Sequence, residues 1–181
     1  KRPSLFEKYL KEYTPDIVML GNYMWNEELN LFYSRILKET SEKTLTVLAG
    51  PNISINLSSK KEFLVNNPSI DILIEGDGEI VASEIVKNFG DLKNSIKELK
   101  QSQVMNTFSY LHNNDEFIVG AEADTRLGVG KLSLDEIPSP YLSGRMDVFF
   151  EDGTIPLLES NRGCPYSCTY CQQGTKYFSK L

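Results

Sequence analysis

The sequence has few cysteines, and they are confined to one place. Residues 1–163 contain none, and the three cysteines of the 181-residue chain are Cys164, Cys168 and Cys171. A disulfide framework spreads an even number of cysteines through a chain, so this distribution argues against one. Three thiols in one short segment indicate a metal or cluster site in a reducing compartment, and we therefore expect a cytoplasmic protein.

The chain also lacks an excess of positive charge and any long apolar segment. It has 19 basic and 25 acidic residues, a net charge of −6, which argues against nucleic acid as a partner because phosphate binding needs a basic surface. Apolar runs such as residues 17–20 are far shorter than the roughly 20 residues that span a bilayer. We therefore expect neither a membrane helix nor a secretory signal. A hydrophobic content of 40% is enough for a globular core.

Three short apolar runs indicate the strands of a parallel sheet. They occupy residues 17–20, 45–49 and 71–74, and a glycine follows each run within two residues. Their hydrophobicity is continuous rather than alternating, which is typical of strands buried on both faces.

Helical periodicity separates and follows these runs. Apolar residues recur at helical spacing through residues 5–13, 27–39, 59–65 and 79–89. Alternating strands and helices predict an open α/β fold with helices on both faces of the sheet. The side chains expected to face the sheet are Leu29, Phe32, Ile36 and Leu37 in the second helix and Ile80, Ile85, Val86 and Phe89 in the fourth.

The remainder of the chain has weaker patterns. Residues 92–99 predict a short amphipathic helix, and residues 103–120 predict a hairpin that turns at 113–115. Prolines at 138 and 140 favour an extended connection between domains.

We predict three regions from these patterns. The first domain occupies residues 1–131 and is expected to be incomplete at its amino end, because the chain opens inside a helical pattern and without methionine. A linker follows over 132–154. Residues 155–181 then form the start of a second domain, with a strand at 155–160 that leads into the cysteine segment.

The loops after the three strands are the candidate ligand site. In open α/β sheets, ligands bind outside the carboxyl ends of the strands, at a topological switch point. The alternative is that these glycines only end strands and permit tight turns. The candidate residues are Gly21, Asn22 and Tyr23 in the first loop, Gly50, Pro51 and Asn52 in the second, and Gly76, Asp77, Gly78 and Glu79 in the third.

The cysteine spacing, C-x3-C-x2-C, favours an iron-sulfur cluster. Three thiolates on one loop can bind three irons of a cubane cluster and leave the fourth iron open. Structural zinc normally takes four protein ligands. The sole histidine, His112, lies beside the predicted hairpin turn and receives no role, so zinc is the less favoured alternative.

The cysteine segment resembles the signature loop of the radical S-adenosylmethionine (SAM) enzymes. Tyr170 directly precedes the third cysteine, and residues 162–165 read Arg-Gly-Cys-Pro, a version typical of the branch with an amino-terminal cobalamin-binding domain. The upstream sequence agrees at residues 15–18, at Trp25-Asn26, and at residues 47–51 and 71–79. The resemblance covers most of residues 3–90 and 132–175.

This resemblance implies a fold and a set of cofactors. The fold would be a flavodoxin-like, cobalamin-binding α/β domain followed by the truncated start of a radical SAM (β/α) barrel. Cys164, Cys168 and Cys171 would hold a [4Fe-4S] cluster whose open iron binds SAM, and Tyr170 would contact the adenine of SAM. The three strand-end loops would hold cobalamin.

The same resemblance implies methyl transfer or another radical modification. The substrate would be an unknown small molecule or peptide, and a flavodoxin or ferredoxin would supply the electron. A (β/α) barrel needs roughly 200 residues or more, so residues 155–181 hold only its beginning and the chain alone is expected to be inactive.

Two features set limits to the resemblance. The Asp-x-His-x-x-Gly motif that supplies a histidine ligand to cobalt in many cobalamin proteins is missing, so any bound cobalamin would lack that ligand. One alternative is a radical SAM methylthiotransferase without cobalamin, although its extra domain would be expected to carry further cysteines. Another is a non-catalytic, metal-stabilised α/β module that senses a ligand.

Overall fold

The computed structural model describes residues 3–121, 137–150, 155–158 and 164–171. The chain divides into two compact units, Lys1–Ala123 and Asp124–Leu181. The first unit contains the sheet and the helices that cover it. Among the described residues, no helix combines the length and the apolar character needed to cross a bilayer.

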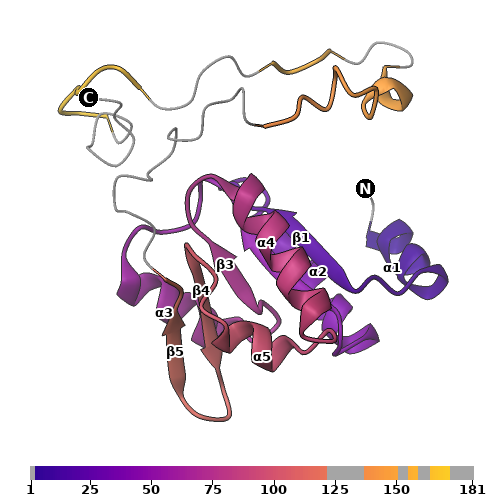
Figure 1. The fold of residues 1–181 in the computed structure, drawn as a ribbon, viewed down its shortest axis with the longest axis vertical. Coiled ribbons are helices and arrows are strands. Elements are labelled where there is room, and N and C mark those ends of the chain that lie inside the picture. The colour runs from indigo at the N-terminus through magenta and orange to yellow at the C-terminus, as the bar shows by residue number, and fades with distance from the viewer. Residues whose placement is uncertain (1–2, 122–136, 151–154, 159–163, 172–181) are drawn as a thin grey trace. The chain divides into compact units, whose positions relative to one another are not determined.

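The first unit is built on a mixed five-stranded sheet (Figure 1). β1, β2 and β3 are parallel, as the apolar runs predicted, and the predicted hairpin extends the same sheet because β4 pairs antiparallel with β3 and β5 with β4. The expected open α/β fold is therefore confirmed. The strands are β1 (Ile17–Gly21), β2 (Leu45–Ala49), β3 (Ile72–Ile74), β4 (Thr107–Leu111) and β5 (Glu116–Val119).

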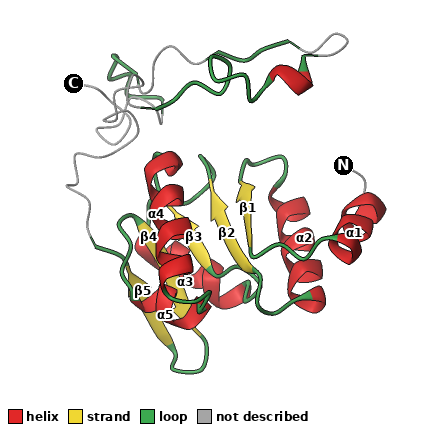
Figure 2. Ribbon diagram, turned by 45° about the vertical axis from the view of Figure 1, so that its right-hand side comes forward, coloured by secondary structure: helices red, strands yellow, loops and turns green. Residues whose placement is uncertain are grey.

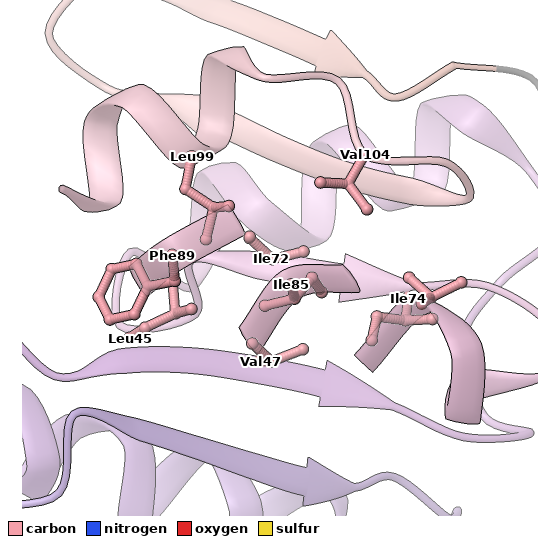
Figure 3. Packing of buried hydrophobic residues seen from close by; sticks show 9 residues of the cluster. Leu45, Val47, Ile72, Ile74, Ile85, Phe89, Leu99 and Val104 are labelled. Carbon is pink, nitrogen blue, oxygen red and sulfur yellow. The ribbon is translucent and has the colours of Figure 1, made fainter. Parts of the chain in front are cut away.

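Helices cover both faces of this sheet (Figure 2). One apolar cluster joins Leu31 of α2 and Leu64 of α3 to Leu48 and Leu73 of the sheet. The other cluster joins α4 and α5 to the opposite face, where Val47 and Ile72 of the same strands point (Figure 3). The helices are α1 (Pro3–Glu12), α2 (Glu27–Thr40), α3 (Leu57–Asn66), α4 (Gly78–Asp91) and α5 (Ile96–Gln101).

The strand order differs from one expectation. β1, β2 and β3 lie side by side in chain order, so the direction of the order does not reverse among the described strands. The predicted topological switch point is therefore not found between these three strands. Successive right-handed crossovers in one direction place α2 and α3 on the same face, which is what the apolar clusters show.

The inward face of α2 was predicted partly wrongly. Leu37 is buried as expected, but Leu29 and Phe32 are 42% and 39% exposed, while Asn30 and Ser34 are buried. These two polar residues face inward because they have partners there. Ser34 Oγ lies 2.7 Å from Ser69 Oγ, and the Asn30 amide bonds to the loop after β1.

The face of α4 was predicted correctly at two of four positions. Ile85 and Phe89 are buried, whereas Ile80 and Val86 are 39% and 53% exposed. Val81 takes the place expected of Ile80, since it lies one turn before Ile85 on the face that contacts the sheet.

The second unit is described over three short segments. A 3-10 turn, η2, covers Asp147–Phe149, and the rings of Tyr141 and Phe150 lie 5.7 Å apart. Residues 155–158, where we expected a strand, are not in one, and residues 159–160 lie outside the described part. A strand requires a neighbouring strand to pair its backbone groups, whereas the Leu157 carbonyl accepts a hydrogen bond from the Tyr141 hydroxyl at 2.8 Å.

Candidate functional site

The three candidate loops meet at one edge of the sheet. β1 and β2 pair with Gly21 opposite Ala49, and β2 and β3 pair with Ala49 opposite Ile74. Because these strands are parallel, their carboxyl ends lie together, and the loops that follow them line the same edge (Figure 1). The structure thus brings the three predicted loops to one place.

The first two loops are bonded to each other through Asn22. This residue has no exposed surface. Its backbone N–H donates to the Ala49 carbonyl at 2.5 Å, and its carbonyl accepts from the Asn52 N–H at 3.2 Å. The first two loops therefore form one connected surface rather than two independent turns.

Gly50 is required by this contact between loops. Its φ angle is +129°, and a Cβ atom there would lie 2.6 Å from the Asn22 carbonyl oxygen and 2.9 Å from the Asn22 nitrogen. Any larger residue would separate the two loops. Gly50 therefore serves the fold itself. This agrees with the alternative interpretation, in which these glycines only end strands and permit tight turns.

The other candidate glycines have different surroundings. A Cβ at Gly21 would meet only the Tyr23 ring, at 3.8 Å, and a Cβ at Gly78 would have no atom within 4 Å. Gly76 has a φ of +80°, in the left-handed region that favours glycine. Open space over Gly21 and Gly78 is compatible with the close approach of a large planar ligand.

Two asparagines and one glutamate hold the first loop, and none of these three was among the predicted site residues. The side-chain amides of Asn26 and Asn30 both donate to the Gly21 carbonyl, at 2.9 and 3.0 Å. The Glu27 Oε2 atom accepts from the Asn22 amide at 2.9 Å. The available signal was that Asn26 directly precedes the predicted helix and Asn30 lies about one turn further on, a spacing that lets both side chains reach the same neighbour.

Two aromatic rings project from the first loop. Tyr23 and Trp25 are 41% and 76% exposed, and their rings stack with centroids 4.8 Å apart. The edge of the sheet therefore presents an apolar aromatic surface beside a network of satisfied polar groups. Such a surface suits a ligand with a large flat apolar face.

The third loop is tied to the second by a buried lysine. Lys60 of α3 is 1% exposed, forms an ion pair with Glu75 and donates to the Ile55 carbonyl at 3.2 Å. Its Nζ atom also lies 4.1 Å from the centroid of the Phe108 ring. Glu75 directly precedes Gly76, so this ion pair holds the start of the third loop against α3.

A buried carboxylate, Asp71, lies at the opposite end of β3 and serves the fold. Asp71 accepts from Lys38 of α2 at 2.5 Å, from Lys100 of α5 at 3.0 Å and from the Thr46 N–H at 2.9 Å. Because these two helices cover opposite faces of the sheet, Asp71 joins both layers. Its oxygens are satisfied by the protein, and we assign it no ligand.

The cysteine loop has the right donors, but they are not gathered. Cys164, Cys168 and Cys171 are free thiols of intermediate exposure, and the Cys171 N–H donates to the Cys168 carbonyl at 3.2 Å. The described residues nevertheless contain no group of three potential ligands placed to hold one metal ion. The donor set fits an iron-sulfur cluster chemically, and the thiols would have to converge when a cluster binds.

Tyr170 stands free beside this loop. Its side chain is 91% exposed, which argues against a packing role. An exposed ring next to Cys171 is available to a ligand held at the cysteines.

Comparison with known proteins shows which enzymes the chain resembles. Family models give no match. The chain is 31% identical over 173 residues to the cobalamin-dependent radical SAM methyltransferase TokK of Streptomyces tokunonensis, a match that covers 92% of this chain. It is 29% identical over 179 residues to the 2-(S-pantetheinyl)-carbapenam-3-carboxylate methyltransferase of Streptantibioticus cattleyicolor, again over 92% of this chain.

A relative with a different reaction also matches. The anaerobic magnesium-protoporphyrin IX monomethyl ester cyclase of Cereibacter sphaeroides is 26% identical over 176 residues. The chain spans only about a quarter of these relatives, 23% of each methyltransferase and 25% of the cyclase.

These matches confirm the resemblance that the cysteine motif indicated. Over the part that it spans, the chain is related to the radical SAM enzymes. The name of TokK also confirms the resemblance to the cobalamin-binding branch, which the Arg-Gly-Cys-Pro sequence and the α/β domain together predicted.

Proposed function

We propose that this chain is the part of a radical SAM enzyme that binds cobalamin and carries the cluster loop. The whole enzyme would transfer a methyl group to its substrate or modify it by another radical reaction. One observation carries the proposal: the similarity to TokK extends over 92% of the chain, and the chain contains both the strand-end loops and the cysteine motif.

In this proposal the three cysteines are the ligands of a [4Fe-4S] cluster that also binds SAM. When bound, the cluster would supply the electron that cleaves SAM. The chain's own residues would hold the cluster by their thiolates, and the exposed Tyr170 ring would contact the adenine of SAM. The thiols must stay reduced, which suits a cytoplasmic enzyme served by a flavodoxin or ferredoxin.

The strand-end loops would hold cobalamin. Gly21 and Gly78 leave open space for its approach, and the Tyr23 and Trp25 rings offer an apolar surface. The only histidine, His112, packs edge-on against Tyr110 at 4.9 Å in the hairpin, so these loops supply no imidazole to cobalt. The residues that would form the cradle are Gly21, Asn22, Tyr23, Gly50, Pro51, Asn52, Gly76, Asp77, Gly78 and Glu79.

The alternatives have less support. Residues 1–163 contain no cysteine, which disfavours a methylthiotransferase because its extra domain would be expected to hold a second cluster. A non-catalytic, metal-stabilised module that senses a ligand would share the α/β fold and would bind its metal through the thiols. Structural zinc normally takes four protein ligands, however, and the cysteine segment supplies three.

Anaerobic reconstitution tests the cluster. The chain should take up about four irons and four sulfides with the visible absorption of a cubane cluster, and Cys168→Ala should abolish this uptake. One zinc per chain without visible absorption would overturn the proposal.

Hydroxocobalamin binding tests the other cofactor separately. The chain should retain hydroxocobalamin through gel filtration whether or not the cluster is present. If the cobalamin elutes apart from the protein, the assignment of the loops is wrong.

A further inference from the structure

We propose that Glu27 is a positioning residue of the cobalamin cradle, because its carboxylate links the first loop to the second. This inference rests on the proposed binding of cobalamin by these loops. Glu27 is the first residue of α2 and lies outside the candidate loops themselves.

The link consists of two hydrogen bonds to one oxygen. Glu27 Oε2 accepts from the side-chain amide of Asn22 at 2.9 Å and from that of Asn52 at 2.7 Å. Asn22 follows β1 and Asn52 follows β2, so a single atom connects loops that come from different strands.

The two amides respond differently to the loss of Glu27. Asn22 is fully buried, and an unpaired amide N–H there would be costly. Asn52 is exposed, and the bond to Glu27 is the one that orients its side chain within the described structure. Removing the carboxylate would therefore loosen the second loop against the first.

The start of α2 does not depend on Glu27 alone. Asn26 and Asn30 both bond to the Gly21 carbonyl, so the helix keeps two contacts with the first loop. Loss of Glu27 should consequently alter the relation between the loops more than it alters the fold.

A second role of Glu27 has to be separated from this link. An acidic residue in the first turn of a helix is stabilising because of the helix dipole, and Glu27 is such a residue. Glu28 lies in the same turn and is exposed, so it provides a control with the same charge at the same helix end.

Four variants of the 181-residue chain distinguish charge from geometry. Glu27→Ala removes both the charge and the acceptor. Glu27→Asp keeps the charge but is one methylene shorter and cannot reach both amides. Glu27→Gln loses the charge but keeps one oxygen at the same reach, and Glu28→Ala removes the neighbouring charge alone.

The readout is hydroxocobalamin binding, followed by absorbance and by quenching of Trp25, the single tryptophan, which lies in the first loop. We expect Glu27→Ala and Glu27→Asp to weaken binding by about tenfold, on the order of what two lost hydrogen bonds produce. Glu27→Gln should stay within about threefold of the wild type, and Glu28→Ala should bind like the wild type. Urea midpoints measured on each variant report its folding.

The outcomes separate this inference from the proposed function. If neither the wild-type chain nor the chain extended to the native start of its first domain binds hydroxocobalamin, the proposed function itself is wrong. If the wild type binds and Glu27→Asp binds equally well, or if Glu28→Ala weakens binding as much as Glu27→Ala, the positioning role is refuted. Should Glu27→Ala fail to fold, the comparison of Glu27→Asp with Glu27→Gln still decides, because each keeps one of the two properties.

Discussion

The ion pair between Lys60 and Glu75 provides a quantitative test of the structure at the candidate site. The Lys60 side chain is 1% exposed and that of Glu75 is 19% exposed. Removing one member of a buried pair costs about 3–5 kcal/mol, because the remaining charge is left in a dry environment. Glu75→Gln should fall at the lower end, near 3 kcal/mol, since Lys60 keeps the Ile55 carbonyl and the Phe108 ring as partners.

The expected loss is large enough to measure. For a protein of this size, 1 kcal/mol shifts Tm by about 2–4 °C, so Glu75→Gln should lower Tm by roughly 6–12 °C. With a urea m-value of about 2 kcal/mol/M, the same loss lowers the urea midpoint by roughly 1.5 M. Circular dichroism follows the unfolding, and a scan repeated after cooling verifies that the transition is reversible.

A double variant and a neighbouring lysine serve as controls. Lys60→Met combined with Glu75→Gln removes both charges and should recover most of the stability, because a neutral buried pair has little desolvation cost. Lys61→Met changes an exposed lysine and should stay within about 0.5 kcal/mol of the wild type. If Glu75→Gln is as mild as Lys61→Met, then Lys60 is not the buried, paired group described above and the reasoning is refuted.

Two further predictions concern the first unit. Gly50→Ala should lower the thermal midpoint by several degrees, because the new Cβ would lie 2.6 Å from the Asn22 carbonyl oxygen. The control Gly78→Ala has open space around its Cβ and should be neutral or slightly stabilising. Equal thermal midpoints for the two variants would contradict the close contact at Gly50. The Asp115 carboxylate, which accepts a hydrogen bond from the Tyr110 hydroxyl, raises the pKa of Tyr110 above its ordinary value. This interaction therefore stabilises the fold fully below about pH 10, and its contribution is lost as the pH rises through the raised pKa. Urea midpoints measured between pH 8 and 11 should fall less steeply for Tyr110→Phe than for the wild type. Parallel curves for the two proteins would argue against the bond.

Much of the fold could be predicted from short-range patterns. The run at residues 45–49 coincides with β2, and the start of β1 at Ile17 was also predicted. Continuous apolar runs identify buried parallel strands because both of their faces are covered. The boundaries of α2 were predicted within one residue, because the apolar periodicity of a helix is also a local signal in the sequence.

The inward residues of α2 could not be predicted in this way. Periodicity ranks residues by hydrophobicity, and it therefore placed Leu29 and Phe32 inside. The structure buries Asn30 and Ser34 instead, because Gly21 and Ser69 supply hydrogen-bond partners that are distant in sequence. Burial of a polar residue depends on a partner, and the partner is known only once the chain has folded.

The candidate site likewise has features that local sequence reveals and features that depend on the fold. Short stretches of sequence were enough to identify the cysteine spacing, the loops after the three strands and the relationship to radical SAM enzymes, since each of these is encoded in neighbouring residues. The folded chain was needed to show that Glu27 joins two loops and that Lys60, rather than its neighbour Lys61, is buried against Glu75. Carboxylate and ammonium groups are well solvated at a protein surface, so the sequence does not show whether such a group is buried. Its role depends on which partners the fold brings within hydrogen-bonding distance.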